Sequence, residues 1–217
     1  MTRSLKICAF LATLGSVIVG VAVGYLRLAR EPCLTWGASD DDVARSLPGD
    51  DLLKSPDVLS TRAITIAAPP SDVWPWLMQM GSGKGGVYTY DWIENLFGLN
   101  MHSANHVIPE FQDRKVGDVE QLGKSGPRLR VAMLDENETM VLQSEDENWV
   151  WIFRLLPRGD GSTRLISRNR ILSPSPSVLL RAFSTFVMEP GSLIMERKML
   201  LGIRQRAEAL SRRPASP

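Results

Sequence analysis

The chain has 217 residues, of which 44% are hydrophobic, and its 25 basic and 24 acidic side chains leave a net charge of +1. This composition suffices for a buried core, which excludes a chain that is disordered as a whole. Residues 1–30 carry four basic and no acidic side chains, so the remainder is mildly acidic; an acidic domain behind a basic, apolar leader argues against nucleic acid as the partner.

The leader is an apolar run. Residues 7–26 are 20 consecutive uncharged residues, which as a helix rising ~1.5 Å per residue would span the ~30 Å hydrocarbon core of a bilayer. We therefore expect residues 1–30 to form a single-pass transmembrane anchor. A cleaved signal peptide is the alternative, because Arg3 and Lys6 precede the run and Ala22-Val23-Gly24 near its end could serve as a small-residue cleavage site. The run exceeds the ~7–15 residues usual in a signal peptide.

The leader also bears on topology and partners. Basic residues flank it on both sides, and the positive-inside rule gives only a slight preference for a plasma-membrane anchor with the domain outside. Ser16, Gly20 and Gly24 recur every four residues and would permit a homodimer through the anchor helix. Glycine is simply common in membrane helices, and this second explanation carries more weight.

Composition divides the rest of the chain. Residues 31–60 are rich in Pro, Gly, Ser and Asp without a sustained period, which predicts a linker with a short helix near 40–46. We expect the folded domain to occupy residues 61–211 and the last residues, 212–217, to be a disordered tail.

The folded domain begins with a strand and two helices. Residues 62–67 alternate, with Ile64 and Ile66 on one face, which predicts a strand. The Pro-Pro-Ser-Asp sequence at 69–72 favours a helix start, and that helix should end at Gly81. A second short helix is expected at 90–97, with its apolar side chains inward: Trp92, Ile93, Leu96 and Phe97.

Strands and then helices complete the domain. Five further strands are expected at 117–122, 128–134, 139–144, 149–156 and 163–172. Both faces of strand 149–156 are apolar, so each face needs a helix or a filled cavity against it. Three arginines, Arg164, Arg168 and Arg170, share one face of the last strand, which we expect to be solvated, with attraction to anionic lipid as a weaker alternative.

The C-terminal part is expected to be helical. A helix at 177–188 should be broken at Pro190-Gly191, after which a longer helix runs to about Leu210. Its three- and four-residue spacing predicts one buried stripe: Met195, Met199, Ile203, Ala207 and Leu210.

This order of elements comes with a family resemblance. The segments RAITIAAPPSDVWPWLMQMG, GGVYTYDWIENLFG, MHSANHVIPEFQDRKVGD and MERKMLLGI resemble the SRPBCC superfamily, the polyketide cyclase/dehydrase and lipid-transport group. The resemblance covers about residues 61–210. It implies an α+β helix-grip fold, in which a curved antiparallel sheet wraps a long C-terminal helix around an apolar cavity. No single catalytic residue set unites the superfamily, so the resemblance implies no particular activity.

The stretch Gly81-Ser82-Gly83-Lys84-Gly85-Gly86 has the spacing of a phosphate-binding loop. A phosphate loop needs a strand before it and a helix N-terminus after it, whereas these glycines follow a predicted helix. We therefore expect Gly81, Gly83, Gly85 and Gly86 to form a flexible loop that gates the cavity.

Polar and aromatic residues nearby are candidates for chemistry. The two histidines, His102 and His106, stand four apart but lack the glutamate of a zinc-protease motif, so we expect no metal and no cofactor. Tyrosine hydroxyls and a carboxylate facing a cavity could act as acid and base, although ordinary packing explains them better. The expected cavity residues are Trp74, Tyr88, Tyr90, Asp91, His102, Trp151, Met195 and Met199.

These observations support three hypotheses. The leading one is a membrane-anchored module that binds or transfers a lipophilic small molecule held in an apolar cavity, and that is not an enzyme. The alternative is an enzyme of the cyclase, dehydratase or isomerase kind that uses Tyr88, Tyr90, Asp91 or His102 in the same cavity. The third is an interaction protein whose cavity is vestigial. Fold analogy does not decide among them.

Overall fold

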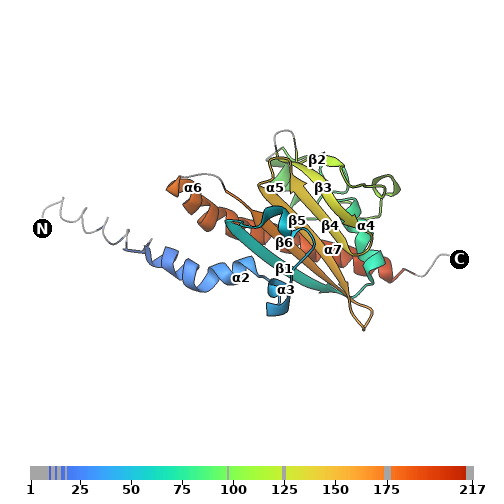
Figure 1. Ribbon diagram of the computed structural model, residues 1–217, viewed down its shortest axis with the longest axis horizontal. Coiled ribbons are helices and arrows are strands. Elements are labelled where there is room, and N and C mark those ends of the chain that lie inside the picture. Colours follow the sequence, from blue (N-terminus) through green and yellow to red (C-terminus); the bar gives the residue numbers. More distant parts are fainter. Residues whose placement is uncertain are drawn as a thin grey trace, which may run out of the picture.

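The computed structural model describes residues 10, 13, 16, 17, 19–96, 98–123, 126–173 and 177–213. Its centre is a curved sheet of six antiparallel strands in the order β1-β6-β5-β4-β3-β2, with the long helix α7 across one face (Figure 1). The strands are β1 (Val58–Ile66), β2 (Val119–Gln121), β3 (Arg128–Asp135), β4 (Thr139–Ser144), β5 (Trp149–Pro157) and β6 (Thr163–Ile171). This arrangement confirms the α+β helix-grip expectation, and strand β1 begins three residues before the predicted domain start.

The helices account for most of the remaining chain. They are η1 (Tyr25–Ala29), α2 (Arg30–Leu34), α3 (Asp40–Ala44), η2 (Asp50–Leu53), α4 (Pro70–Met78), α5 (Asp91–Leu96), η3 (Pro109–Phe111), α6 (Val178–Phe183), η4 (Ser184–Met188) and α7 (Glu189–Ser211). Pro70 stands in the first turn of α4, where its missing N–H costs nothing. The C-terminal residues 214–217, expected to be a tail, lie outside the described residues.

Strand β5 is packed on both faces, as its sequence predicts. On the inner face, Phe153 and Leu155 join a core with α4 and α7. On the outer face, Val150 and Ile152 join a second core with Leu47 and with side chains of η2. The two-sided apolar pattern therefore arises because the sheet lies between α7 and the segment that precedes β1.

That preceding segment was expected to be a linker, and the structure corrects this. Ser39 caps α3 with a complete capping box, and the segment then covers the outer face of the sheet. The three arginines of β6 are not solvated: Arg164 binds Asp42, while Arg168 and Arg170 both bind Asp50. Two of the acidic residues of segment 31–60, Asp42 and Asp50, are thus the partners of the β6 arginines.

Two details of the helices also differ from expectation. In α5 the apolar side chains Trp92 and Leu96 are exposed and Glu94 is buried, so this helix turns its acidic side chain inward; Phe97 lies outside the described side chains. Pro190 does not break the C-terminal helix, because it stands in the first turn of α7, directly after the π-helical turn η4, and proline is tolerated in a first turn.

The expected transmembrane anchor lies largely outside the described residues. Of the run 7–26, the described residues are helical and mostly exposed, and helical residues 19–24 continue directly into η1. In the described part of the chain, one helix is long and apolar enough to cross a bilayer, Val178–Ser211. Its second half belongs to the core, since Met199, Leu200 and Ile203 are buried.

Candidate functional site

A cavity of about 390 Å³ lies between the inner face of the sheet, helix α7 and residues 87–94. Its size is within the range of small-molecule sites. Its walls combine mostly apolar side chains with a few polar ones: Leu34, Val58, Ser60, Arg62, Val87, Thr89, Glu94, Trp149, Trp151, Asn169, Ile171, Met188, Ser192, Met195, Glu196 and Met199.

Two tryptophans of β5 form one wall. The rings of Trp149 and Trp151 stack with their centroids 5.5 Å apart. Their indole N–H groups are satisfied, because Trp149 donates to Asn169 at 2.8 Å and Trp151 donates to Ser167 at 2.9 Å. The aromatic surfaces are therefore available to an apolar ligand without leaving a polar group unpaired. Opposite them, the thioethers of Met195 and Met199 can adapt to ligands of different shape.

A buried ion pair borders the cavity. The guanidinium of Arg62 on β1 is fully buried and pairs with Glu196 on α7. It also donates to the backbone carbonyl of Cys33 and to the Ser192 hydroxyl. Glu196 in turn accepts from Ser167 at 2.6 Å. Burial raises the pKa of the Glu196 carboxyl, and the charge of Arg62 opposes this shift. The surrounding hydrogen bonds satisfy the other polar atoms of the pair.

Two neighbouring polar groups of the cavity wall are buried, Oε2 of Glu94 and the hydroxyl of Thr89, and neither has a hydrogen-bond partner beyond the other among the described residues. Burial raises the pKa of the Glu94 carboxyl, a hydrogen bond with Thr89 opposes this shift, and the charge of Asp91 adds to it. Because buried polar groups are otherwise almost always hydrogen-bonded, this pair can hydrogen-bond to a polar group of a bound molecule.

The residues expected at the cavity divide into two sets. Trp151, Met195 and Met199 line it. The other five, Trp74, Tyr88, Tyr90, Asp91 and His102, lie elsewhere: the first two are core residues and His102 is exposed.

The phenol of Tyr88 and the carboxylate of Asp91 have structural partners. Tyr88 donates to the backbone carbonyl of Trp76 at 2.9 Å, and burial raises its pKa well above the usual value. Asp91 accepts from the backbone N–H and the hydroxyl of Ser103 at 2.8 and 2.6 Å. Tyr90 lies under the ammonium of Lys198. These side chains therefore do not converge on one reacting centre.

The glycine-rich loop is anchored to its surroundings. Gly81 and Gly86 exchange backbone hydrogen bonds at 3.1 and 3.2 Å, and the N–H of Gly83 donates to Asn100. Gly86 has a φ of +69°, and a Cβ there would lie 2.9 Å from the backbone of residues 102 and 103, so glycine is needed at this close approach. None of the four glycines is among the residues that line the cavity, so the observed geometry gives no support to a gate.

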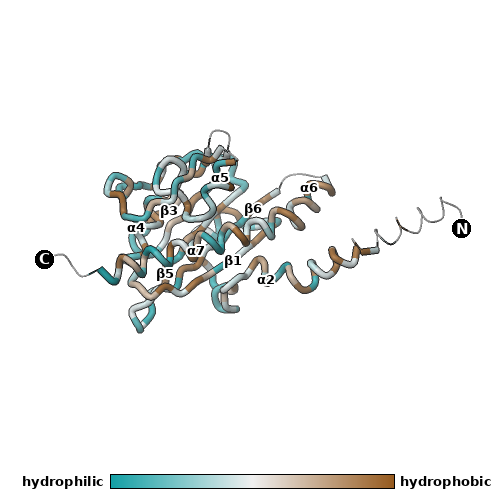
Figure 2. The backbone as a smooth tube through the Cα atoms, turned by 180° about the vertical axis from the view of Figure 1, so that it is seen from behind, coloured by the Kyte–Doolittle hydropathy of each residue, from teal (hydrophilic) through white to brown (hydrophobic). Residues whose placement is uncertain are grey.

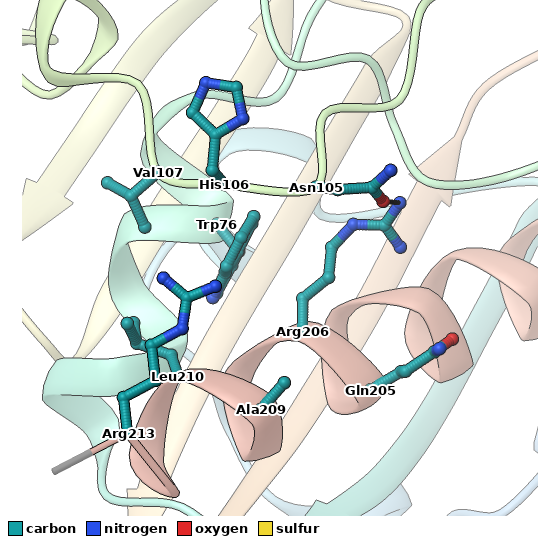
Figure 3. A pocket seen from close by; sticks show the side chains of 9 residues that line it. All are labelled: Trp76, Asn105, His106, Val107, Gln205, Arg206, Ala209, Leu210 and Arg213. Atoms are coloured by element: carbon teal, nitrogen blue, oxygen red, sulfur yellow. Dashed lines mark hydrogen bonds between the residues drawn. The ribbon is translucent and has the colours of Figure 1, made fainter.

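A second, more polar pocket of about 350 Å³ lies at the other end of α7 (Figure 3). His106 and Arg206 line it, and Arg206 is already bonded to Ala104 and Asn105. Within the described ranges, no group of three or more His, Cys, Asp and Glu side chains is placed to hold a metal ion.

Sequence reasoning missed the Arg62–Glu196 pair. Arg62 is in phase with the inward-facing Ile64 and Ile66, and Glu196 is three residues from Met199 on the buried face of α7. In each of these two elements a charged residue occupies a position where the periodicity predicts a buried apolar side chain. Two such residues of opposite charge are the signal that could have revealed a buried pair.

The comparisons with known proteins concern the fold. No family model and no curated protein matches the chain. Matching solved structures include the self-sacrificing resistance protein CalC from Micromonospora echinospora, with 10% identity, a TM-score of 0.45, and coverage of 73% of this chain and 99% of that one. A Polyketide_cyc-like protein from Corynebacterium glutamicum has 19% identity, a TM-score of 0.34, and coverage of 71% and 89%. The Aha1 dimer from Colwellia psychrerythraea has 15% identity, a TM-score of 0.42, and coverage of 70% and 96%.

The fold and the cavity define a helix-grip domain with a partly open apolar site between the sheet and α7. The class rests on the antiparallel sheet and α7 of this chain itself.

Proposed function

We propose that this domain binds a lipophilic small molecule in the cavity between β5 and α7, and that the N-terminal apolar helix tethers it to a membrane. The observation that carries the proposal is the cavity itself, with stacked tryptophans, methionines and the buried Glu94 carboxyl in its wall. An apolar cavity with a few fixed polar groups is the general form of a small-molecule site.

The polar atoms restrict the chemistry of the ligand. Since Glu94 and Thr89 have no partner beyond each other among the described residues, the ligand should be an apolar molecule with an uncharged oxygen group, such as a hydroxyl or carbonyl. An anionic head would be desolvated without an opposite charge, because the guanidinium of Arg62 is already paired with Glu196.

Native mass spectrometry of the full chain tests ligand binding, with all-trans-retinol, an uncharged polyene alcohol, as the probe. We expect a one-to-one adduct on the wild type. Met195→Trp places an indole in the cavity wall and should weaken the adduct at least tenfold, whereas Arg204→Trp on the exposed side of the same helix should not. An absent wild-type adduct, or equal binding by Met195→Trp, would refute the proposed site.

Alkaline carbonate extraction tests the tether. An anchored chain stays in the membrane pellet at full mass because 20 uncharged residues precede Arg27. Recovery of a shorter, soluble protein would show a cleaved signal peptide instead.

A further inference from the structure

Helix α6 and the turn η4 expose an apolar surface that no other described part of the domain covers. Leu179 is 81% exposed and Phe183 is 52% exposed. The other large apolar side chains of the segment with at least half of their surface exposed are Val178, Leu180, Val187 and Met188. Monomeric soluble proteins rarely expose such a contiguous patch, and it marks an interaction site.

This segment projects from the same end of the domain as the N-terminal helix, and both carry hydrophobic residues (Figures 1 and 2). The two are in contact where they leave the domain: the rings of Tyr25 and Phe186 are 5.6 Å apart. Arg30 also donates to both carboxylate oxygens of Glu189, at 2.9 and 2.8 Å. The exposed surface of α6 and η4 is therefore continuous with the apolar leader.

The cavity lies at this same end. Its lining includes the first residue of β1, Val58, and the last residue of β6, Ile171. These two residues are paired at one end of the neighbouring strands β1 and β6. Leu34, the last residue of α2, and Met188, the last residue of η4, complete that side. Met188 thus belongs both to the exposed surface and to the cavity wall.

We propose that α6 and η4 insert into the membrane leaflet beside the N-terminal helix, so that this end of the cavity meets lipid directly. The proposal rests on the proposed anchoring. Residues 178–188 would be ~16 Å long at 1.5 Å per residue, about half of the ~30 Å hydrocarbon core. The segment therefore lies in one leaflet, as interfacial helices do, while the buried half of α7 stays with the domain.

Charge favours a bilayer over a second copy of the chain as the occupant. Residues 178–188 contain one charged side chain, Arg181, and no acidic one. A second basic residue, Arg27, belongs to η1, whose Tyr25 ring contacts Phe186. Anionic headgroups attract basic residues placed next to an inserted segment, whereas a second copy would bring the same basic residues together. The first acidic residue after the segment, Glu189, is 3% exposed and already paired.

Spin-label accessibility tests insertion on the full chain in vesicles of phosphatidylcholine and phosphatidylglycerol. With Cys8 and the buried Cys33 replaced by Ser, single cysteines would replace Leu179, Phe183 or, as the control, the exposed Arg204. Labels at 179 and 183 should collide mainly with oxygen, which concentrates in lipid, and the label at 204 mainly with a water-soluble nickel complex. Equal access of the nickel complex to the labels at 179 and 204 would overturn the proposal. Spin–spin coupling between two copies, at labels that collide with neither oxygen nor nickel, would also overturn it, because it would show a dimer interface.

Ligand transfer gives a second readout. Leu179→Glu/Phe183→Glu should slow the loading of all-trans-retinol from those vesicles at least tenfold without lowering the melting temperature, because both side chains are exposed. Val116→Glu, at an exposed apolar residue outside the segment, is the matched control. Wild-type loading speed in the double variant would overturn direct transfer. Failure of the wild type to load would instead refute the proposed ligand site and leave the accessibility result to decide insertion.

Discussion

Replacing Glu196 with Leu should strongly destabilise the domain. The change removes the partner of a fully buried guanidinium and leaves Arg62 with only the Cys33 carbonyl and the Ser192 hydroxyl. Removing one member of a buried ion pair costs about 3–5 kcal/mol. In a domain of this size each kcal/mol lowers the melting temperature by about 2–4 °C, which gives a shift of roughly 6–20 °C.

The paired variant separates desolvation from packing. Arg62→Met/Glu196→Leu removes both charges and replaces them with apolar side chains, which is often neutral or stabilising. We expect it to melt well above Glu196→Leu and close to the wild type. Thermal unfolding of the full chain in detergent, followed by circular dichroism in a double-mutant cycle, measures both changes. If Glu196→Leu melts within about 2 °C of the wild type, or if the double variant is no more stable than the single one, the reasoning is refuted.

Two other changes probe the outer face and the cavity wall. Asp50→Ala leaves Arg168 and Arg170 without their carboxylate and should cost about 2–3 kcal/mol of unfolding free energy in urea titrations, whereas Asp51→Ala next to it should cost under about 0.5 kcal/mol; equal effects would mean that residues 31–57 do not stabilise the sheet. The Glu94 carboxyl has a raised pKa in the folded state, so its contribution to stability is complete below its unfolded pKa of about 4.3 and is lost as pH rises through the folded pKa, at about 1.4 kcal/mol per pKa unit. The difference in urea midpoint between Glu94→Gln and the wild type should therefore favour the variant more at pH 7 than at pH 4. A difference that is the same at both pH values would contradict this.

Local pattern sufficed to predict most of the sheet and helices. Strand β4 has the bounds predicted from its composition, and the apolar stripe of α7 is buried at Met199, Ile203 and Ala207. These elements follow from periodicity alone, because each buries one continuous face against the same core. For the cavity, the same logic predicted Trp151, Met195 and Met199, which lie on elements with a clear inward face.

The errors arose where a residue's partner is distant in sequence. Residues 31–57 are acidic and rich in turn formers, so composition predicts a linker, yet their carboxylates pair with arginines more than 100 residues later. The sequence held an indication of this, since the outer face of β5 carries Val150 and Ile152 and needs a cover. In α5 the inward side chain is Glu94, which periodicity assigns to solvent because its unusual environment comes from tertiary packing.

The contact between the N-terminal helix and α7 would determine how the domain stands on a membrane. A flexible linker, which the composition predicted, would let the cavity face any direction relative to the bilayer. Arg30 instead donates two hydrogen bonds to the carboxylate of Glu189, one to each oxygen. Such a bidentate contact fixes orientation as well as distance. Because Glu189 is the first residue of α7 and Met188 before it lines the cavity, the same contact holds the cavity end next to the apolar leader. A site that exchanges a lipophile with a bilayer requires its opening to stay next to the membrane, because moving an apolar ligand through water costs free energy.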